Sequence, residues 1–310
     1  MLLLVLLIGL IHGIIYVRLI PPWQHYDEPG HVEYAWLIAD RLQIPKEGDY
    51  DQSMRREMAA SMVEHDFFKG LDFRPNLLSL NEPIWIGYSQ IYGLPLYYIL
   101  VALPLRLVRY SDITFQLYLG RTVSLFLYLI TIIAAYGIIR EITPNNHPLR
   151  WMVPLSLALL PGFVDIMTAV NDDVGAAAAF SLFLWAGVRV MQKGFSWLRV
   201  AALGITAIAC TLTKNTVIVA SILLVIPLLL MIFRKIPQRY LWVGISTLGL
   251  LLTFALFRRG DAAYWHRDTN QRLYTRAPSV AAPIGKEVFQ LKSANGIFQL
   301  IPHSYLSELR

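Results

Sequence analysis

The 310-residue chain has little of what soluble enzymes and disulfide-linked secreted domains are built from. Charged residues make up only 15% of it, compared with about 25% in soluble domains. Its single cysteine, Cys210, excludes a disulfide framework and a metal site built from several thiolates. We find no internal repeat and no low-complexity tract. These absences leave a chain dominated by apolar residues, which account for 56% of it.

The apolar residues form long runs. The run from Leu2 to Ile20 is interrupted only by His12 and Arg18, and at 1.5 Å per residue it can cross a ~30 Å hydrocarbon core. No small-residue cleavage site follows it, so we interpret it as a retained membrane helix and not as a signal peptide. Further candidate helices lie at 91–108, 117–139, 151–170 (with a break at Pro161-Gly162), 174–191, 198–213, 216–233 and 240–257. The chain is therefore predicted to be an all-α polytopic membrane protein.

The charges are unevenly distributed along the chain. Residues 21–90 hold twelve of the 21 acids but only six of the 27 lysines and arginines. Three basic clusters punctuate the later helices, and two helices separate each from the next: Arg140 and Arg150; Arg189, Lys193 and Arg199; Arg234, Lys235 and Arg239. Since lysine and arginine favour short cytoplasmic loops, the three clusters should share the cytoplasmic side. The 21–90 segment and the hinges at 171–173 and 213–215 should then lie outside.

This threading requires an odd number of crossings between residue 90 and Arg140. The 91–108 segment contains Gly93, Pro95 and Pro104, so we expect it to lie along or dip into the membrane while 117–139 crosses it. The alternative is an ordinary span that ends at cytoplasmic Arg106 and Arg109.

Two parts of the 21–90 segment have apolar residues at helical spacing. They are Val32, Ala35, Trp36 and Ala39 in the first, and Met54, Met58, Met62 and Val63 in the second. We expect amphipathic helices that rest on the bilayer surface. They either roof a lateral opening between the spans or simply pack at the interface.

An acidic pair follows the first apolar run, where charge is costly and rarely without a role. Asp27 precedes Glu28-Pro29, which favours a helix start, so Asp27 is either a helix cap or a general base that takes a proton from an acceptor hydroxyl. His31 lies one turn further on and could orient the acid. Asp27, Glu28 and His31 are also candidate ligands of a divalent cation.

Polar residues also mark the other two external hinges. Asp172 and Asp173 follow Asn171 as either a polar helix cap or a functional acid pair. Lys214 either extends to the interface or holds a phosphate, as could Arg121. The remaining candidates are Lys69 and Arg74, interpreted as solvated loop charges, and Tyr97 and Tyr98, interpreted as aromatic interface anchors.

The order of these short motifs resembles the GT-C superfamily of polytopic membrane glycosyltransferases, which includes protein O-mannosyltransferases, aminoarabinose transferases and unassigned bacterial members. The resemblance covers residues 1–257 and rests on Tyr26-Asp27-Glu28-Pro29-Gly30-His31, Gly93-Leu94-Pro95-Leu96-Tyr97-Tyr98, Gly120-Arg121-Thr122-Val123-Ser124, Asn171-Asp172-Asp173 and Leu212-Thr213-Lys214.

The resemblance implies a GT-C-like transmembrane bundle in the cytoplasmic (inner) membrane with its active site on the external face. It implies transfer of a sugar from a polyprenyl-phosphate donor to a hydroxyl of a lipid, glycan or protein acceptor. The catalytic candidates are Asp27 as base, with Glu28 and Asp172, and the substrate-binding candidates are His31, Asp173, Lys214, Arg121 and Tyr97. No cofactor is implied beyond the candidate divalent cation.

Two other functions remain open at this point. Asp172, Asp173 and Lys214 could form the substrate or proton path of a transporter or flippase. The external loop could instead bind a partner in a non-catalytic assembly or receptor protein. Nucleic-acid binding is not indicated, because the basic residues fit cytoplasmic loops.

The chain changes character after residue 257. We expect a transmembrane domain at 1–257, including the external loop 21–90, and an external polar tail at 258–310. Within the tail, 288–291 and 297–301 alternate like strands around a turn at 293–296, which suggests the beginning of a truncated β domain.

Overall fold

A computed structural model of the chain describes residues 1–46, 48–70, 74–78, 83–232, 292–294 and 297–299. The chain divides into two compact units. The first comprises Met1–Glu47 with Tyr88–Leu256, and the second comprises Gly48–Gly87 with Phe257–Arg310. The 240–257 candidate helix and the 288–291 candidate strand lie outside the described residues.

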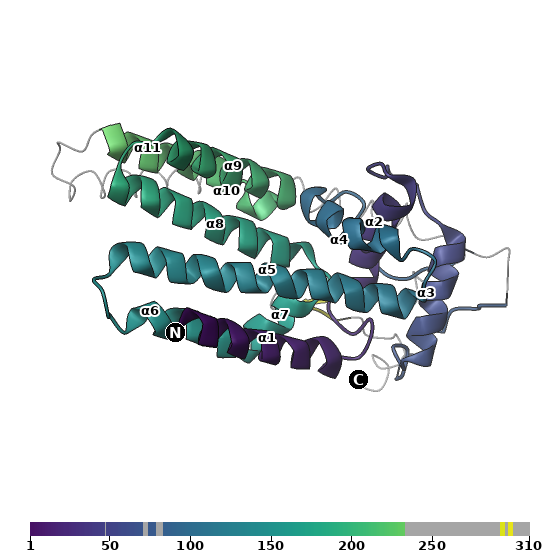
Figure 1. Cartoon of the computed structure of the whole chain (residues 1–310). Coiled ribbons are helices and arrows are strands. Elements are labelled where there is room, and N and C mark those ends of the chain that lie inside the picture. The colour runs from purple at the N-terminus through teal and green to yellow at the C-terminus, as the bar shows by residue number, and fades with distance from the viewer. Residues whose placement is uncertain (47, 71–73, 79–82, 233–291, 295–296, 300–310) are drawn as a thin grey trace. The chain divides into compact units, whose positions relative to one another are not determined.

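The described part of the first unit is helical (Figure 1). Its elements are α1 (Leu2–Leu19), α2 (Glu28–Arg41), α4 (Leu96–Leu107), α5 (Ile113–Ile142), α6 (Leu149–Leu159), α7 (Pro161–Thr168), α8 (Asp172–Lys193), α9 (Trp197–Thr213), the 3-10 turn η1 (Asn215–Val217), α10 (Val219–Leu223) and α11 (Val225–Ile232). The prediction of a mostly helical membrane protein is confirmed.

The second unit contains α3 (Gln52–Glu64) and two short strands, β1 (Lys292–Ala294) and β2 (Ile297–Gln299). The strands pair antiparallel, with Lys292 opposite Gln299. A hairpin was predicted here, but Ser293 and Ala294 belong to its first strand and not to its turn. Asn295 and Gly296, which separate the two strands in the sequence, lie outside the described residues.

Three of the described helices are long and apolar enough to cross a membrane: α1, α5 and α8. A fourth crossing results if α6 and α7, which are bent by 65° at their junction, form one broken span. The bend lies at the predicted break, because Pro161 opens α7 and a proline in the first helical turn loses no hydrogen bond. Helix α4 has 12 residues, about 18 Å at 1.5 Å per residue, and is thus shorter than a full crossing.

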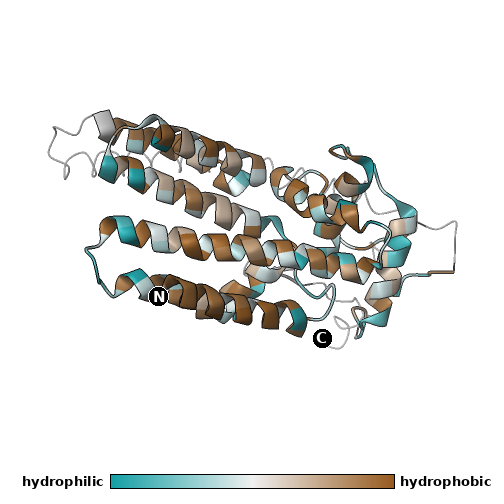
Figure 2. Cartoon of the chain, viewed as in Figure 1, coloured by the Kyte–Doolittle hydropathy of each residue, from teal (hydrophilic) through white to brown (hydrophobic). Residues whose placement is uncertain are grey.

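The helices of the first unit pack side by side along their lengths (Figure 1). Helix α1 packs against α5 and α6, α5 packs against α8, and α8 packs against α9. Gly9 and Gly13 lie on the buried face of α1, where an added Cβ would come within 2.9 Å of Ile132 and 2.3 Å of Leu125 on α5. Such i, i+4 small residues allow membrane helices to approach closely. Figure 2 shows that these helices are apolar along most of their lengths.

Helix α2 differs from its prediction. Its apolar residues have the expected helical spacing, but 11 of its 14 residues are buried, including Glu28, His31 and Glu33. It packs against α4, and Tyr34 donates a hydrogen bond to the carbonyl of Gly93. The structure thus places α2 inside the first unit and not on an exposed surface.

The backbone of α2 comes so close to the 88–90 segment that only glycine fits at position 30. A Cβ at Gly30 would lie 1.9 Å from the carbonyl oxygen of Tyr88, which is backbone and cannot rotate away. We expect Gly30→Ala to lower the free energy of unfolding by about 1–3 kcal/mol, as overpacking does. Thermal unfolding in detergent or nanodiscs measures the change.

The matched control is Gly204→Ala on α9, where an added Cβ meets no atom within 4 Å. There alanine should leave stability unchanged or raise it by up to about 1 kcal/mol through helix propensity. The same direction and size of change at both positions would contradict the close approach at Gly30.

Candidate functional site

Three connections that are far apart in sequence meet in the first unit. They are the α1–α2 loop, which carries Asp27, the α7–α8 connection, which leads directly into Asp172 and Asp173 at the start of α8, and the α9–η1 hinge, which carries Lys214. The ammonium of Lys214 lies 2.8 Å from Asp172 Oδ1 and 2.7 Å from Asp173 Oδ1. It also lies close enough to Asp27 to affect the pKa of that carboxyl group. The three connections therefore form one charged site.

Asp27 stands at the N-cap position of α2 but does not cap the helix with its side chain. Its backbone adopts the left-handed conformation (φ 53°), which aspartate tolerates better than most residues. Within the described residues its half-buried carboxylate has no hydrogen bond or ion pair. Burial raises the pKa of Asp27 to about 6, although the charge of Lys214 acts in the opposite direction. A carboxyl group in this state can exchange a proton near neutral pH.

Asp172 and Asp173 open α8, and Asn171 caps this helix by accepting a hydrogen bond from the Asp173 N–H. The Asp172 side chain is mostly buried while that of Asp173 is half exposed. Burial lowers the pKa of Lys214, but the two carboxylates outweigh this effect and raise it. Lys214 is thus a charged ammonium held between two acids, with one of its three N–H donors not used by them.

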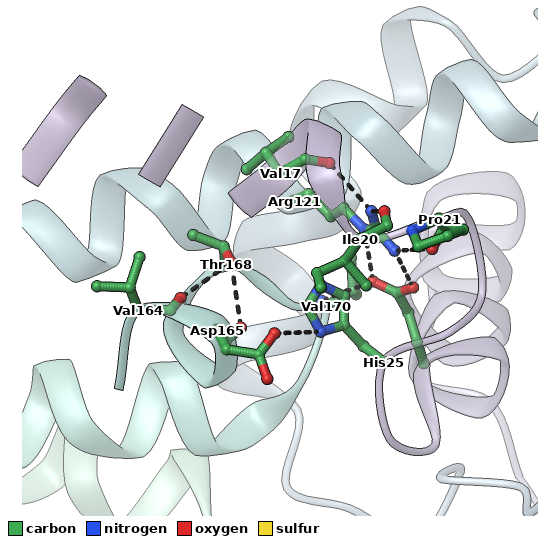
Figure 3. Close-up of polar contacts among 10 residues, drawn as sticks. Val17, Ile20, Pro21, His25, Arg121, Val164, Asp165, Thr168 and Val170 are labelled. Atoms are coloured by element: carbon green, nitrogen blue, oxygen red, sulfur yellow. Dashed lines mark hydrogen bonds and ion pairs between the residues drawn. The ribbon is translucent and has the colours of Figure 1, made fainter. Parts of the chain in front are cut away.

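Next to this site, Arg121 (labelled in Figure 3) and Glu28 form a fully buried ion pair. Arg121 Nε and Nη2 donate to the two carboxylate oxygens of Glu28 at 2.9 and 2.7 Å. The other donations go to the carbonyls of Val17, Ile20 and Pro21 at the end of α1. All five guanidinium N–H groups are therefore used within the protein.

This ion pair changes the roles expected for both residues. Arg121 was expected to hold a phosphate, but it has no free donor and no exposed surface. Glu28 was expected to be catalytic, but it binds Arg121 and accepts a hydrogen bond from the backbone N–H of Val170 at 3.2 Å. Both residues thus position the ends of α1, α2 and α7 around the charged site.

Tyr97 and His31 are also internal. The Tyr97 hydroxyl lies 2.8 Å from the Ser124 hydroxyl and accepts from the Asn171 N–H at 2.9 Å, so it positions the start of α8. His31 Nδ1 lies 2.8 Å from the Tyr98 hydroxyl. Burial, followed by the charge of Lys214, lowers the pKa of His31 to about 3, so the ring is neutral. Neither side chain is exposed to a ligand, in contrast to their expected substrate-binding roles.

The predicted metal ligands do not assemble. No group of three or more His, Cys, Asp or Glu side chains in the described part of the chain could hold a metal ion. Glu28 turns to Arg121 and His31 to Tyr98, which leaves Asp27 without either of them as a co-ligand. In the second unit, Lys69 forms an exposed pair with Asp66, as expected for a solvated loop charge.

Asp165 on α7 is a site residue that was not predicted from the sequence. Its carboxylate lies 3.4 Å from Nδ1 of the buried His25, close to the Arg121–Glu28 pair (Figure 3). The signal was present in the sequence, since Asp165 is the only charged residue between Trp151 and Val170. An acid inside an apolar membrane segment is rarely without a partner or a role.

We expect Glu28→Gln to lower the free energy of unfolding by about 3–5 kcal/mol, because it leaves the Arg121 charge buried without its counter-ion. Thermal unfolding of the variant and of the wild-type protein in the same lipid measures the change. Lys69→Ala is the control, because its exposed ion pair should contribute less than about 1 kcal/mol. Equal small effects of the two changes would show that the buried pair does not hold the fold together.

Comparison with known proteins adds one match. No curated protein and no solved structure matches the chain. Residues 10–270 match the family described as "Predicted membrane protein (DUF2142)". This range includes the charged site, the Arg121–Glu28 pair and all of the candidate spans except the first residues of α1. The match and the apolar helices together identify an integral membrane protein, and the chain belongs to the DUF2142 family.

Proposed function

We propose that the protein is a membrane glycosyltransferase that moves a sugar from a polyprenyl-phosphate donor to an acceptor hydroxyl, with Asp27 as the general base. The observation that carries the proposal is the unpartnered, half-buried carboxylate of Asp27, which lies within the electrostatic influence of the cation Lys214. A lone carboxylate is what hydroxyl activation needs, and a nearby cation is what a phosphate leaving group needs.

Asp27 and Lys214 together account for the proton and the leaving group of the proposed transfer. Asp27 takes the proton of the acceptor hydroxyl, whose oxygen forms a bond to the anomeric carbon of the donor sugar. The bond between that carbon and the phosphate oxygen breaks, and its electron pair leaves with the lipid phosphate. The remaining N–H of Lys214 donates to this phosphate, whose added negative charge the ammonium offsets.

The pKa of Asp27 suits this role. A general base works best when its pKa lies near the operating pH, because it is then both deprotonated and basic. Burial provides that shift, to about 6, and the unpartnered carboxylate is available to a substrate.

The charge distribution supports an external site. Asp172 and Lys193 stand at opposite ends of α8, about 30 Å apart at 1.5 Å per residue. Lys193 and Arg189 pair with Glu141 near the end of α5, next to Arg140. Since basic residues favour the cytoplasmic side, the acidic end of α8 faces outward in this proposal.

We expect Asp27→Asn to lower kcat by about 100-fold or more while donor binding is retained, since loss of a general base has this effect. Wild-type kcat should fall as the pH drops through about 6, because protonated Asp27 cannot accept the proton. Release of lipid phosphate from a panel of polyprenyl-phosphate sugars, with the purified protein in nanodiscs, is the measurement. Substrate flux without lipid phosphate release would favour a transporter instead.

Asp66→Asn is a matched control, because Asp66 has the same left-handed backbone (φ 58°) but lies in an exposed pair.

The pH dependence of stability gives a second test of Asp27. The raised pKa means that burial of the ionised Asp27 opposes folding, increasingly as the pH rises from about 4 to about 6. Asp27→Asn should therefore raise the melting temperature at pH 7 and leave it unchanged below pH 4. A lower melting temperature at pH 7 would indicate a structural role.

Replacement of Lys214 tests the phosphate contact. We expect Lys214→Gln to lower kcat/KM by about 10- to 100-fold, since a hydrogen bond to a charged group contributes about 1.5–3 kcal/mol. Lys214→Arg should restore part of the activity because it keeps the positive charge. Lys193→Gln at the other end of α8 is the control, and it should leave kcat/KM unchanged. Equal losses for both glutamine variants would rule out a specific role for Lys214.

A further inference from the structure

A small cavity with polar walls, here named the His25 cavity, lies in the first unit beside the charged site. Its volume is about 170 Å³, and its polar wall is formed by Gln24, His25, Tyr26, Asp165 and Asn171. Ile20, which follows α1, and Ile166 and Ala169, at and just after α7, complete the lining. Pockets for drug-sized ligands measure about 300–1,000 Å³, so this one admits only a single small ring or a few water molecules.

Two polar atoms at this cavity have no hydrogen-bond partner in the part of the chain that the structure describes. They are Nε2 of His25 and Oδ1 of Asp165, and both atoms are buried. Oδ1 has only the 3.4 Å ion-pair contact with His25 Nδ1, and the Asp165 side chain as a whole is 43% exposed. His25 is 8% exposed, so more than nine-tenths of it is removed from solvent. Buried polar atoms are nearly always paired, and an unpaired one beside a cavity therefore points to a ligand that completes it.

The pair of residues also determines what kind of ligand fits. Asp165 lies 3.4 Å from Nδ1 of His25 (Figure 3), which favours the tautomer with the proton on Nδ1. Burial lowers the pKa of His25, so the ring is neutral. Nε2 is then an acceptor, like the carboxylate oxygen of Asp165. The His25 cavity thus offers two acceptors and requires a ligand with hydrogen-bond donors.

We infer that the His25 cavity binds a hydroxylated, sugar-like ring, with hydroxyl groups that donate to His25 Nε2 and Asp165 Oδ1. A ring of this kind matches the small volume, and its neutral charge suits a wall that contains a carboxylate. Tyr26, which is 71% exposed, provides an aromatic face at the rim. Amide side chains from Gln24 and Asn171 provide both donors and acceptors for further hydroxyl groups.

The position of the cavity suggests which ring it holds. Tyr26 and Asn171 directly precede Asp27 and Asp172, so the cavity adjoins the charged site. In the proposed transfer, the cavity holds the acceptor ring next to the base; this assignment rests on the proposed function. His25 binds the ring, whereas Asp165 also positions the tautomer of His25.

Chemical protection of His25 tests the inference without any turnover. Diethylpyrocarbonate modifies neutral imidazole nitrogens, and peptide mass spectrometry reports the rate at each histidine of the full chain in nanodiscs. The probe is n-octyl β-D-glucoside below its micelle concentration, and the reference is n-octyl tri(ethylene glycol), which has the same tail but no ring hydroxyls. We expect the glucoside to slow modification of His25 several-fold while the reference compound does not. His147 should react equally in all samples.

Two variants on α7 localise the effect. Asp165→Ala removes one acceptor and should abolish most of the protection. Ile166 lines the same cavity without a polar group, so Ile166→Ala should retain the protection. Equal protection by the reference compound would show that the alkyl tail occupies the cavity, and octylammonium that protects better than the glucoside would show an amine site. Either result, or no protection by the glucoside, overturns the inference.

The protection assay tests the His25 cavity and the transfer assay tests glycosyl transfer, so the two proposals can be refuted independently. Protection by the glucoside should persist in Asp27→Asn, because this variant lacks only the proposed base. Protection without lipid phosphate release from any donor would leave the sugar-like site standing and refute glycosyl transfer. Lipid phosphate release without protection would support glycosyl transfer and refute the sugar-like site at the His25 cavity.

Discussion

The fully buried pair of Arg121 and Glu28 organises the part of the molecule in which the charged site lies. Burial of two charges is costly, and such a pair adds little to stability unless its other hydrogen bonds are also satisfied. Here they are, because Arg121 also binds three carbonyls at the end of α1, and Glu28 also binds the backbone of Val170. Arg121 on α5 thereby joins the end of α1 to the start of α2, and its partner Glu28 adds the connection to α8.

This saturated pair contrasts with the groups around it. Asp27 is the next residue before Glu28, yet it has no partner among the described residues and occupies a left-handed backbone conformation. The His25 and Asp165 side chains retain buried atoms without a hydrogen bond beside a cavity. Unpaired, partly buried polar groups reduce stability, and functional sites are where proteins retain them. The rigid ion pair positions these groups, and they in turn are available for chemistry.

Much of the architecture could be predicted from the sequence because it follows from local properties. Apolar runs of sufficient length predict α1, α5 and α8, and a proline in the first turn predicts the break before α7. The polar hinges at Asp27, Asp172 and Lys214 stand out because each interrupts apolar sequence. Alternation of basic and acidic connections then indicates that the three hinges share one face.

The sequence by itself thus determined the helices, their approximate ends and the residue types at the hinges, since these depend on neighbours along the chain. Only the tertiary structure decided which charges pair. Nothing local distinguishes Glu28, which binds Arg121 across 93 positions, from Asp27, which binds no described residue. The same holds for Tyr97 and His31, whose partners come from other helices. Pairing depends on distances between elements distant in sequence, and the packing of the helices sets those distances.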